Sequence, residues 1–384
     1  MCGKLVFFEM KKLCEMRMLY VFVLLCIGFN GLLILGNQYG EDYVSYVKEA
    51  GQKAGRRMGD EFSGKALLLP DCVEKERLLS ETGKATDIFE TYDPNKTAKL
   101  LIGTYRMEGW PAEALERKYQ KQEQRIHELD AADASMDLGA AGMTKTLFEF
   151  LFAKLCRAVI TEGMLTAVFA ALYMSGCEQT ERTWQIVYAT RRGRMVHREK
   201  LLAGFFYTMA VYSVTAQISY MVFAFVWQLG DIWNTNMSTQ FYTISASGME
   251  VPFVPWMDVT LRGYLVAVTM LGAGVAVLFY LLAYLAGLMT KNSLKAFLVL
   301  FVAFALNFEI IMLAGDAGRW GFYEAALWTP VFFWWSQPLW FSDMGIHAVV
   351  PWQECAVATL CLIAAALLLV YGFHYFSRKD LERV

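Results

Sequence analysis

Residues 177–200 read CEQTERTWQIVYATRRGRMVHREK and separate two apolar runs, Ala158–Gly176 and Leu201–Leu229. A helix needs about 20 predominantly apolar residues to cross the hydrocarbon layer of a bilayer. Both runs approach or exceed that length, and the segment between them is polar and rich in arginine. The stretch therefore predicts two membrane-spanning helices joined by a basic loop.

The composition extends this interpretation to the whole chain. Of its 384 residues, 56% are hydrophobic and only 19% are charged, which is more apolar surface than one soluble core buries. The predicted fold class is an all-α polytopic membrane protein with six transmembrane helices. No small-x-small cleavage site follows the first run, so we expect an uncleaved first span. The six runs are Leu19–Gly36, Ala158–Gly176, Leu201–Leu229, Gly263–Leu288, Leu294–Ala314 and Cys355–Phe376.

Lysine and arginine in the short loops predict the orientation, because they accumulate on the cytoplasmic side. Basic residues occur in the N-terminal tail, in the 177–200 loop, beside the turn at 291–295 and in the C-terminal tail. The connection 230–260 has none, and 316–353 has only Arg319. We therefore expect a multi-pass protein of the cell membrane, with both termini and the 177–200 loop in the cytoplasm.

The long polar stretch 37–146 is then an extracytoplasmic domain between spans one and two. It follows an N-terminal tail and first span (1–36) and precedes a five-span membrane domain (147–384). A helix start at Trp110-Pro111-Ala112-Glu113 predicts a helix to about residue 134, and a second helix is expected over 41–58. Turn residues between 59 and 105 leave room for a strand or two. We expect a mainly helical domain that folds independently.

Two further segments are unusual for their aromatic or charged residues. Tryptophan and phenylalanine fill 322–344, which Pro330 and Pro338 interrupt. Aromatic residues favour the membrane interface, so this segment predicts a pair of short re-entrant or interfacial helices on the outer side. In 143–157, charged residues punctuate an apolar run, which predicts an interfacial helix or an extension of span two.

The 177–200 loop carries its own helix signals. Ser175 to Glu178 form a capping-box pattern, which predicts that a helix starts there. Trp184, Val187 and Tyr188 then follow at helical spacing and form an apolar stripe, and a break follows at 191–194. A docking surface for a cytoplasmic partner would need such a stripe. A helix that lies on anionic lipid would use the same residues.

Polar residues inside the predicted spans are the other candidates for function. Such groups are costly at membrane depth and tend to face the protein interior or a water-filled path. They predict a translocation pathway or a subunit interface, and the alternative is that they hold the spans together by hydrogen bonds. The residues are Asn30, Glu162, Gln217, Asn307 and Glu309.

Other functional classes lack their sequence signals. The chain contains no phosphate-binding loop, nucleophile elbow or zinc-protease motif. Its cysteines and histidines have no metal-ligand spacing, and its eight cysteines do not suggest a disulfide framework. The net charge of -2 does not point to nucleic acid. We therefore expect a chain that is not an enzyme and holds no cofactor or nucleic acid.

The order of these features resembles the permease subunit of ABC transporters of the ABC-type-2 exporter family. The segment Glu178–Lys200 is similar to the family's cytoplasmic coupling region, including the stretch Thr190-Arg191-Arg192-Gly193-Arg194. The aromatic run 322–344 is similar to its paired outer re-entrant helices. The C-terminal Phe373–Leu381 is similar to its closing basic-Asp-Leu tail.

This resemblance implies an ATP-driven exporter whose ATP hydrolysis takes place in a separate cytoplasmic ABC ATPase. It also implies a second permease, either identical or a paralogue, among membrane lipids. The ATPase would act on the coupling region and move the spans as rigid bodies. The implied coupling residues are Glu178, Glu181, Arg182, Trp184, Val187, Tyr188, Thr190, Arg191, Gly193, Arg194 and Lys200.

Two other classes remain open. One is a membrane receptor or scaffold, in which the outer domain senses a ligand and the loop contacts a signalling protein. The other is an ion-coupled secondary transporter with Glu162 and Glu309 as ion carriers. An internal inverted repeat would favour the secondary transporter, and the sequence has none that we find.

Overall fold

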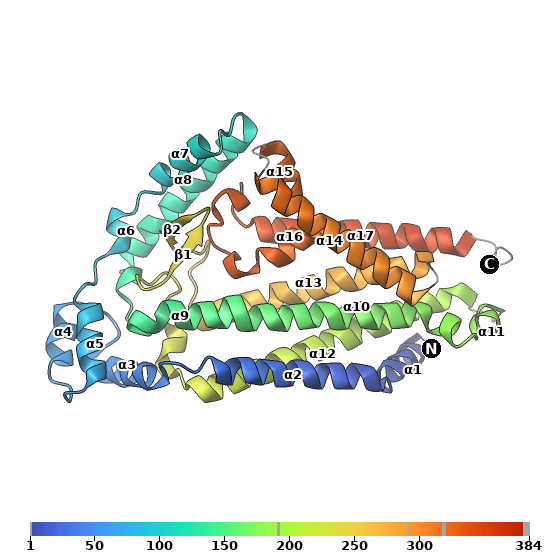
Figure 1. Cartoon of the computed structure of the whole chain (residues 1–384), viewed down its shortest axis with the longest axis horizontal. Coiled ribbons are helices and arrows are strands. Elements are labelled where there is room, and N and C mark those ends of the chain that lie inside the picture. Colours follow the sequence, from blue (N-terminus) through green and yellow to red (C-terminus); the bar gives the residue numbers. More distant parts are fainter. Residues whose placement is uncertain (1, 190–192, 291, 317–319, 379–384) are drawn as a thin grey trace.

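The computed structural model describes residues 2–189, 193–290, 292–316 and 320–378 (Figure 1). Six helical segments in this part of the chain are long and apolar enough to cross a membrane, so the predicted multi-pass architecture is confirmed at that level. These segments are α2 (Arg17–Gly36), the stretch Ala141–Thr180, α12 (Val196–Trp227), α13 (Leu261–Thr290), α14 (Ser293–Asp316) and α17 (Gln353–Arg378).

The second span is the longest and lies in the middle of the bundle. It runs without a break through α9 (Thr144–Glu149), the π-helical turn η3 (Phe150–Cys156) and α10 (Arg157–Thr180). The charged stretch at 143–157 is therefore an extension of this span. Glycines let α10 approach its neighbours closely, because a Cβ on Gly163 would lie 2.4 Å from the Tyr212 ring.

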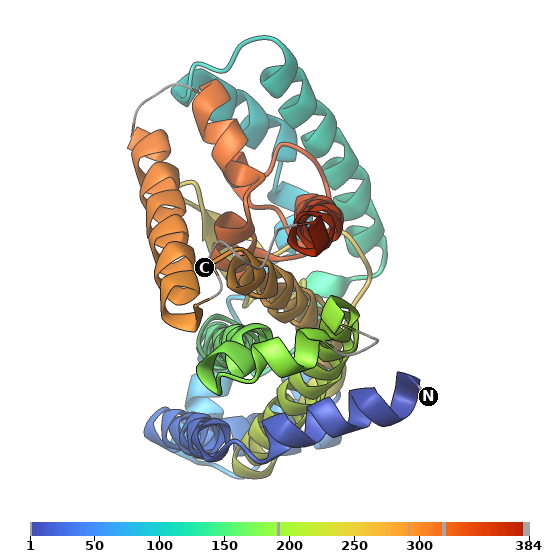
Figure 2. The same ribbon diagram turned by 90° about the vertical axis from the view of Figure 1, so that its right-hand side faces the viewer.

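One end of the bundle collects segments that are far apart in the sequence. Helix α1 (Cys2–Cys14) lies across this end and packs against α12 (Figure 2). The short helix α11 (Trp184–Ala189) and the C-terminal end of α17 lie at the same end, and the 37–140 insert lies at the opposite end (Figure 1). The loops thus alternate between the two ends of the bundle, as predicted. That the α11 end faces the cytoplasm stays a prediction.

The insert is helical throughout its described elements. The two predicted helices are present as α3 and α8. The prediction of a strand or two between 59 and 105 is wrong, because short helices occupy that stretch. Local capping explains one of them: the Asp93 carboxylate accepts hydrogen bonds from the backbone N–H groups of Asn95 and Lys96, and Pro94 follows it. The helices are α3 (Glu41–Ala54), α4 (Asp60–Ala66), α5 (Val73–Thr82), α6 (Ile88–Thr91), α7 (Pro94–Thr104) and α8 (Trp110–Ala131).

The insert does not enclose a hydrophobic core of its own. Among the described residues, each of the three buried apolar clusters that contain insert side chains also contains residues of 147–384. Val44 and Val47 of α3 belong to the cluster of the spans. Leu115 and Tyr119 of α8 share a cluster with Leu327. The structure therefore argues against the expected independent folding of this region.

Short elements connect the spans at the insert end. The 322–344 region forms two short helices, α15 (Trp320–Leu327) and α16 (Pro330–Trp335), as its prolines predict. A β-hairpin, which the sequence did not suggest, joins α12 to α13 through β1 (Thr243–Ala246) and β2 (Met249–Pro252). Ser247 and Gly248 both have positive φ at its tip, which suits a tight two-residue turn.

A buried ion pair ties α8 to the loop before the last span. Lys118 is 0% exposed and its ammonium donates to Asp343 Oδ1 at 2.7 Å and to the carbonyls of Gly345 and Ala348. Tyr119 donates to Asp343 Oδ2 at 2.7 Å. Burial beside this carboxylate raises the pKa of Tyr119 above its usual range, so the hydroxyl stays protonated and keeps donating.

We expect Lys118→Met to destabilise the protein by about 3–5 kcal/mol, because it leaves the Asp343 carboxylate buried without its cation. Thermal unfolding of the purified protein in detergent measures this loss. Lys121→Met is the matched control, since Lys121 is exposed on the same helix. Equal melting temperatures for the two variants would contradict the role of the ion pair.

Candidate functional site

The capping-box prediction is wrong, because Ser175 lies inside α10 and no helix begins there. Helix α10 continues to Thr180, and residues 175–178 are buried within its last turns. The Ser175 hydroxyl donates to the Leu172 carbonyl at 3.2 Å instead of capping a new helix. A Cβ on Gly176 would lie 2.3 Å from Ser293 Oγ, so small side chains here allow close packing.

Glu178 and Lys200, which begin and end the predicted coupling region, face each other inside the protein. They form an ion pair that is nearly inaccessible, with 4% and 0% of the residue surface exposed. The Lys200 ammonium also donates to the Met174 carbonyl at 3.3 Å and to Cys177 Sγ at 2.8 Å. A cation beside the C-terminal turn of α10 is favourable for the helix dipole. The pair therefore clamps the end of α10 to the start of α12.

A second set of contacts holds α11 against the bundle. The Tyr188 hydroxyl lies 3.0 Å from His197 Nε2, and His197 Nδ1 lies 3.1 Å from the Tyr284 hydroxyl. Tyr284 donates to the His197 carbonyl at 2.9 Å, so a neutral imidazole with its proton on Nδ1 satisfies all three groups. Phe376 packs edge-on against both Tyr188 and His197. Tyr188 thus links α11 to α12, α13 and α17.

The sequence identified Tyr188 but not the other three residues of this set of contacts. His197, Tyr284 and Phe376 come from separate spans, and no local pattern marks them as neighbours. Only the histidine offers a signal, because a polar aromatic residue at the start of a span needs a hydrogen-bond partner.

The apolar stripe of α11 faces its own chain more than the outside. Trp184, Val187 and Tyr188 are each partly buried. The opposite face carries Ile186, which is 73% exposed. Exposed polar residues of the predicted coupling region, Glu181 and Arg182, precede this helix.

The predicted break after α11 lies only partly within the described residues. Gly193 has φ of +48°, a left-handed conformation that favours glycine. Thr190 and Arg191 lie outside the described residues, and so does the side chain of Arg194.

Two of the predicted polar residues meet in the middle of the bundle. Asn30 of α2 donates from Nδ2 to Glu162 Oε2 of α10 at 2.8 Å and lies 3.0 Å from Ser219 Oγ of α12. All three side chains are buried. Three spans are thus joined by one polar cluster, and Ser219 is the member that the sequence did not reveal.

The other three polar candidates do not join this cluster. Gln217 and Glu309 are exposed on the surfaces of α12 and α14, and Asn307 is partly buried on α14. They therefore do not line a common path with Glu162 within one chain.

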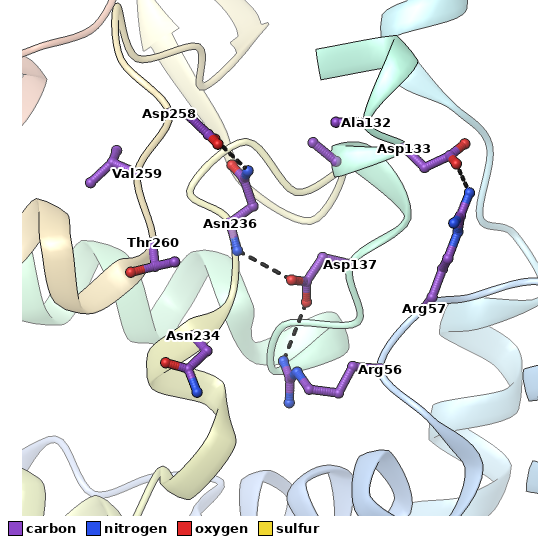
Figure 3. A pocket seen from close by; sticks show the side chains of 11 residues that line it. Arg56, Arg57, Ala132, Asp133, Asp137, Asn234, Asn236, Asp258, Val259 and Thr260 are labelled. Carbon is purple, nitrogen blue, oxygen red and sulfur yellow. Dashed lines mark hydrogen bonds and ion pairs between the residues drawn. The ribbon is translucent and has the colours of Figure 1, made fainter. Parts of the chain in front are cut away.

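A polar pocket of about 380 Å³ lies at the insert end (Figure 3). Arg56 points toward Asp137, with 3.3 Å between Nη2 and Oδ1, and Arg57 pairs with Asp133. Asp137 also accepts from the Asn236 backbone N–H at 3.2 Å. The pocket's arginines thus have carboxylate partners within it, and these contacts fasten three chain segments to one another.

We expect Lys200→Met to lower stability by about 3–5 kcal/mol, because Glu178 is then buried without a cation. The double variant Glu178→Gln, Lys200→Met removes both charges and recovers part of that loss. Lys295→Met, at an exposed position of the same end, is the control. A Lys200→Met melting temperature equal to that of Lys295→Met would refute an internal clamp and restore Lys200 as an available contact residue.

No protein-family model, curated protein or solved structure matches the chain.

Proposed function

We propose that the chain is the permease subunit of an ATP-driven exporter, in which a separate cytoplasmic ATPase acts on the end of the bundle that carries α11. The observation that carries the proposal is the attachment of this helix. It follows α10 and precedes α12 in the chain, and Tyr188 and its neighbours connect it to α13 and α17. A displacement of α11 would therefore be passed to four spans together.

The exposed side of α11 offers a contact of the kind that interfaces use. Ile186 projects from the short helix with 73% of its surface exposed, while neighbouring side chains hold the helix in place. A side chain that is exposed in the free protein and becomes buried in a pocket of the partner can act as an anchor of an interface. At the same end of the bundle, a groove of about 460 Å³ is lined by Met195, Phe373 and other residues of the α12 and α17 ends. Arg198 and His374 add polar groups to this groove.

A second permease would have a place on α14. This helix lies at the edge of the bundle (Figure 2), and its membrane-length window is only 11% buried. Glu309 is exposed on it, about two turns before its end at Asp316. A carboxylate that faces lipid is costly, so coverage by an identical or paralogous permease would remove that cost.

In this scheme ATP changes the transporter only through its different affinities for two states of the complex. ATPase closure would move α11, and the spans joined to it would follow as rigid bodies. The Glu178–Lys200 clamp contributes by preventing α10 and α12 from separating at their shared end.

The polar cluster in the middle of the spans supports a second candidate function. The Glu162 carboxylate is buried and bonded to Asn30, an arrangement that could carry a proton or ion across the membrane. An ion-coupled secondary transporter would lose transport in Glu162→Gln and would have no ATPase partner. An exporter would keep its ATPase in the same variant.

The test exchanges Ile186 in two ways. Ile186→Glu should weaken association with the ATPase by about 30-fold, the equivalent of an anchor worth about 2 kcal/mol. Ile186→Trp keeps the affinity of α11 for a membrane interface but does not fit a groove shaped for isoleucine. Co-purification of the ATPase and its stimulated ATP hydrolysis are measured for both variants.

The two variants distinguish docking of α11 to an ATPase from attachment of α11 to lipid. Loss of association in both variants supports docking, whereas loss in Ile186→Glu alone favours a helix that lies on lipid. Absence of any ATPase that co-purifies with the wild-type chain would overturn the exporter proposal.

A further inference from the structure

A lateral groove of about 540 Å³ opens between α2 and α10, away from the α11 contacts. Its apolar wall comes from α2, with Phe22, Leu25, Phe29 and Leu33. These positions span about 16 Å along the helix axis, which is roughly half the hydrocarbon thickness of a bilayer. The groove therefore has the length of one leaflet.

The groove ends in two cations at the side of the insert. Lys154 is exposed, and both it and Arg157, three residues later, line the groove. Both belong to or directly follow the π-helical turn η3, a geometry that occurs frequently at functional sites.

Arg157 is held without a carboxylate partner. Its guanidinium carbon lies 5.5 Å and 4.9 Å from the ring centroids of Trp334 and Trp335, and Nη2 donates to the Trp335 carbonyl. It forms no ion pair with any residue that the structure describes, and its buried Nε has no hydrogen-bond partner there. A buried guanidinium donor without a partner is costly, and a phosphate matches the donors of arginine.

The other polar groups of the groove each have a hydrogen-bond partner within the chain. Lys154 donates to Asn37 Oδ1 at 3.2 Å, a neutral acceptor that leaves its charge uncompensated. Thr161 accepts from Trp334 Nε1 at 3.0 Å, and Glu162 accepts from Asn30. The groove thus combines an apolar wall with a positive end. Its one carboxylate, Glu162, lies deeper, so it repels an anionic headgroup from the interior of the groove and leaves the positive end as the place for it.

We propose that this groove binds one anionic phospholipid from the leaflet on the side of the insert. The phosphate lies against Arg157 and Lys154, and one acyl chain lies along Leu33, Phe29, Leu25 and Phe22. Only 22% of the membrane-length window of α2 is buried within the chain, so the bound lipid also covers part of this helix. The site is independent of the ATPase contact at the opposite end of the bundle.

The experiment uses the full chain in nanodiscs of phosphatidylcholine, with or without a minority of phosphatidylglycerol. Native mass spectrometry of the released protein counts retained phosphatidylglycerol. We expect wild type to retain one molecule, and Arg157→Gln and Lys154→Gln each to weaken retention by about tenfold, the effect of a lost charged hydrogen bond. Arg262→Gln, an exposed arginine at the start of α13 and outside the groove, should behave as wild type.

A steric variant distinguishes a lipid from a free anion. Leu25→Trp fills the groove from an exposed position and keeps both cations, so it should lose the phosphatidylglycerol. Retention of phosphatidylglycerol in Leu25→Trp, or its displacement from wild type by inorganic phosphate, would mean that no acyl chain occupies the groove and overturn the proposal. Equal retention in Lys154→Gln and Arg262→Gln would also overturn it, and this comparison holds even if Arg157→Gln fails to fold.

Discussion

The close packing of α10 against its neighbours is the constraint on which the rest of the structure depends. In a bilayer the association of helices gains little from the hydrophobic effect, so it depends on short contacts between small residues and on hydrogen bonds. A Cβ on Gly287 would lie 1.9 Å from Ser175 Oγ, and one on Gly272 would lie 2.5 Å from Ile160. Larger residues at these positions would force α13 away from α10.

The same helix carries one member of each polar site in the spans. Arg157 lies at the lateral groove, Glu162 lies in the central cluster, and Glu178 lies in the clamp at the end of the bundle that carries α11. At about 1.5 Å per residue, Glu162 lies about 7 Å and Glu178 about 31 Å from Arg157 along the axis. The three polar sites therefore lie along one continuous helix, with the groove and the coupling end at opposite ends of it.

Two buried ion pairs lie at the two ends of the molecule, whereas Arg157 has no ion-pair partner among the described residues. Lys118 with Asp343 and Lys200 with Glu178 join segments distant in the sequence, and each pair is almost completely buried. A buried pair contributes little net stability compared with apolar residues, but it penalises any arrangement that separates it. Arg157, in contrast, contacts two aromatic rings and a carbonyl but no carboxylate in the described part of the chain, which is why the groove is the place where an external anion would fit.

The sequence by itself determined the six spans, the two main insert helices and the short helices around Pro330. Each of these depends on local properties, namely apolar length, a helix start with proline, or proline interruption. It also placed Asn30 and Glu162 at membrane depth, where a polar side chain needs a partner, but it could not say that Ser219 would complete their cluster.

Only the tertiary structure decided which faces meet. The capping pattern at Ser175–Glu178 is overridden because α13 and α14 pack over these residues and the helix continues. Glu178 and Lys200 become internal partners, the insert shares its clusters with the spans, and Gln217 and Glu309 remain on the surface. The physical reason is that a uniformly apolar span has no distinct polar face. Its rotation and its neighbours therefore depend on contacts between residues far apart in the chain, which local periodicity does not encode.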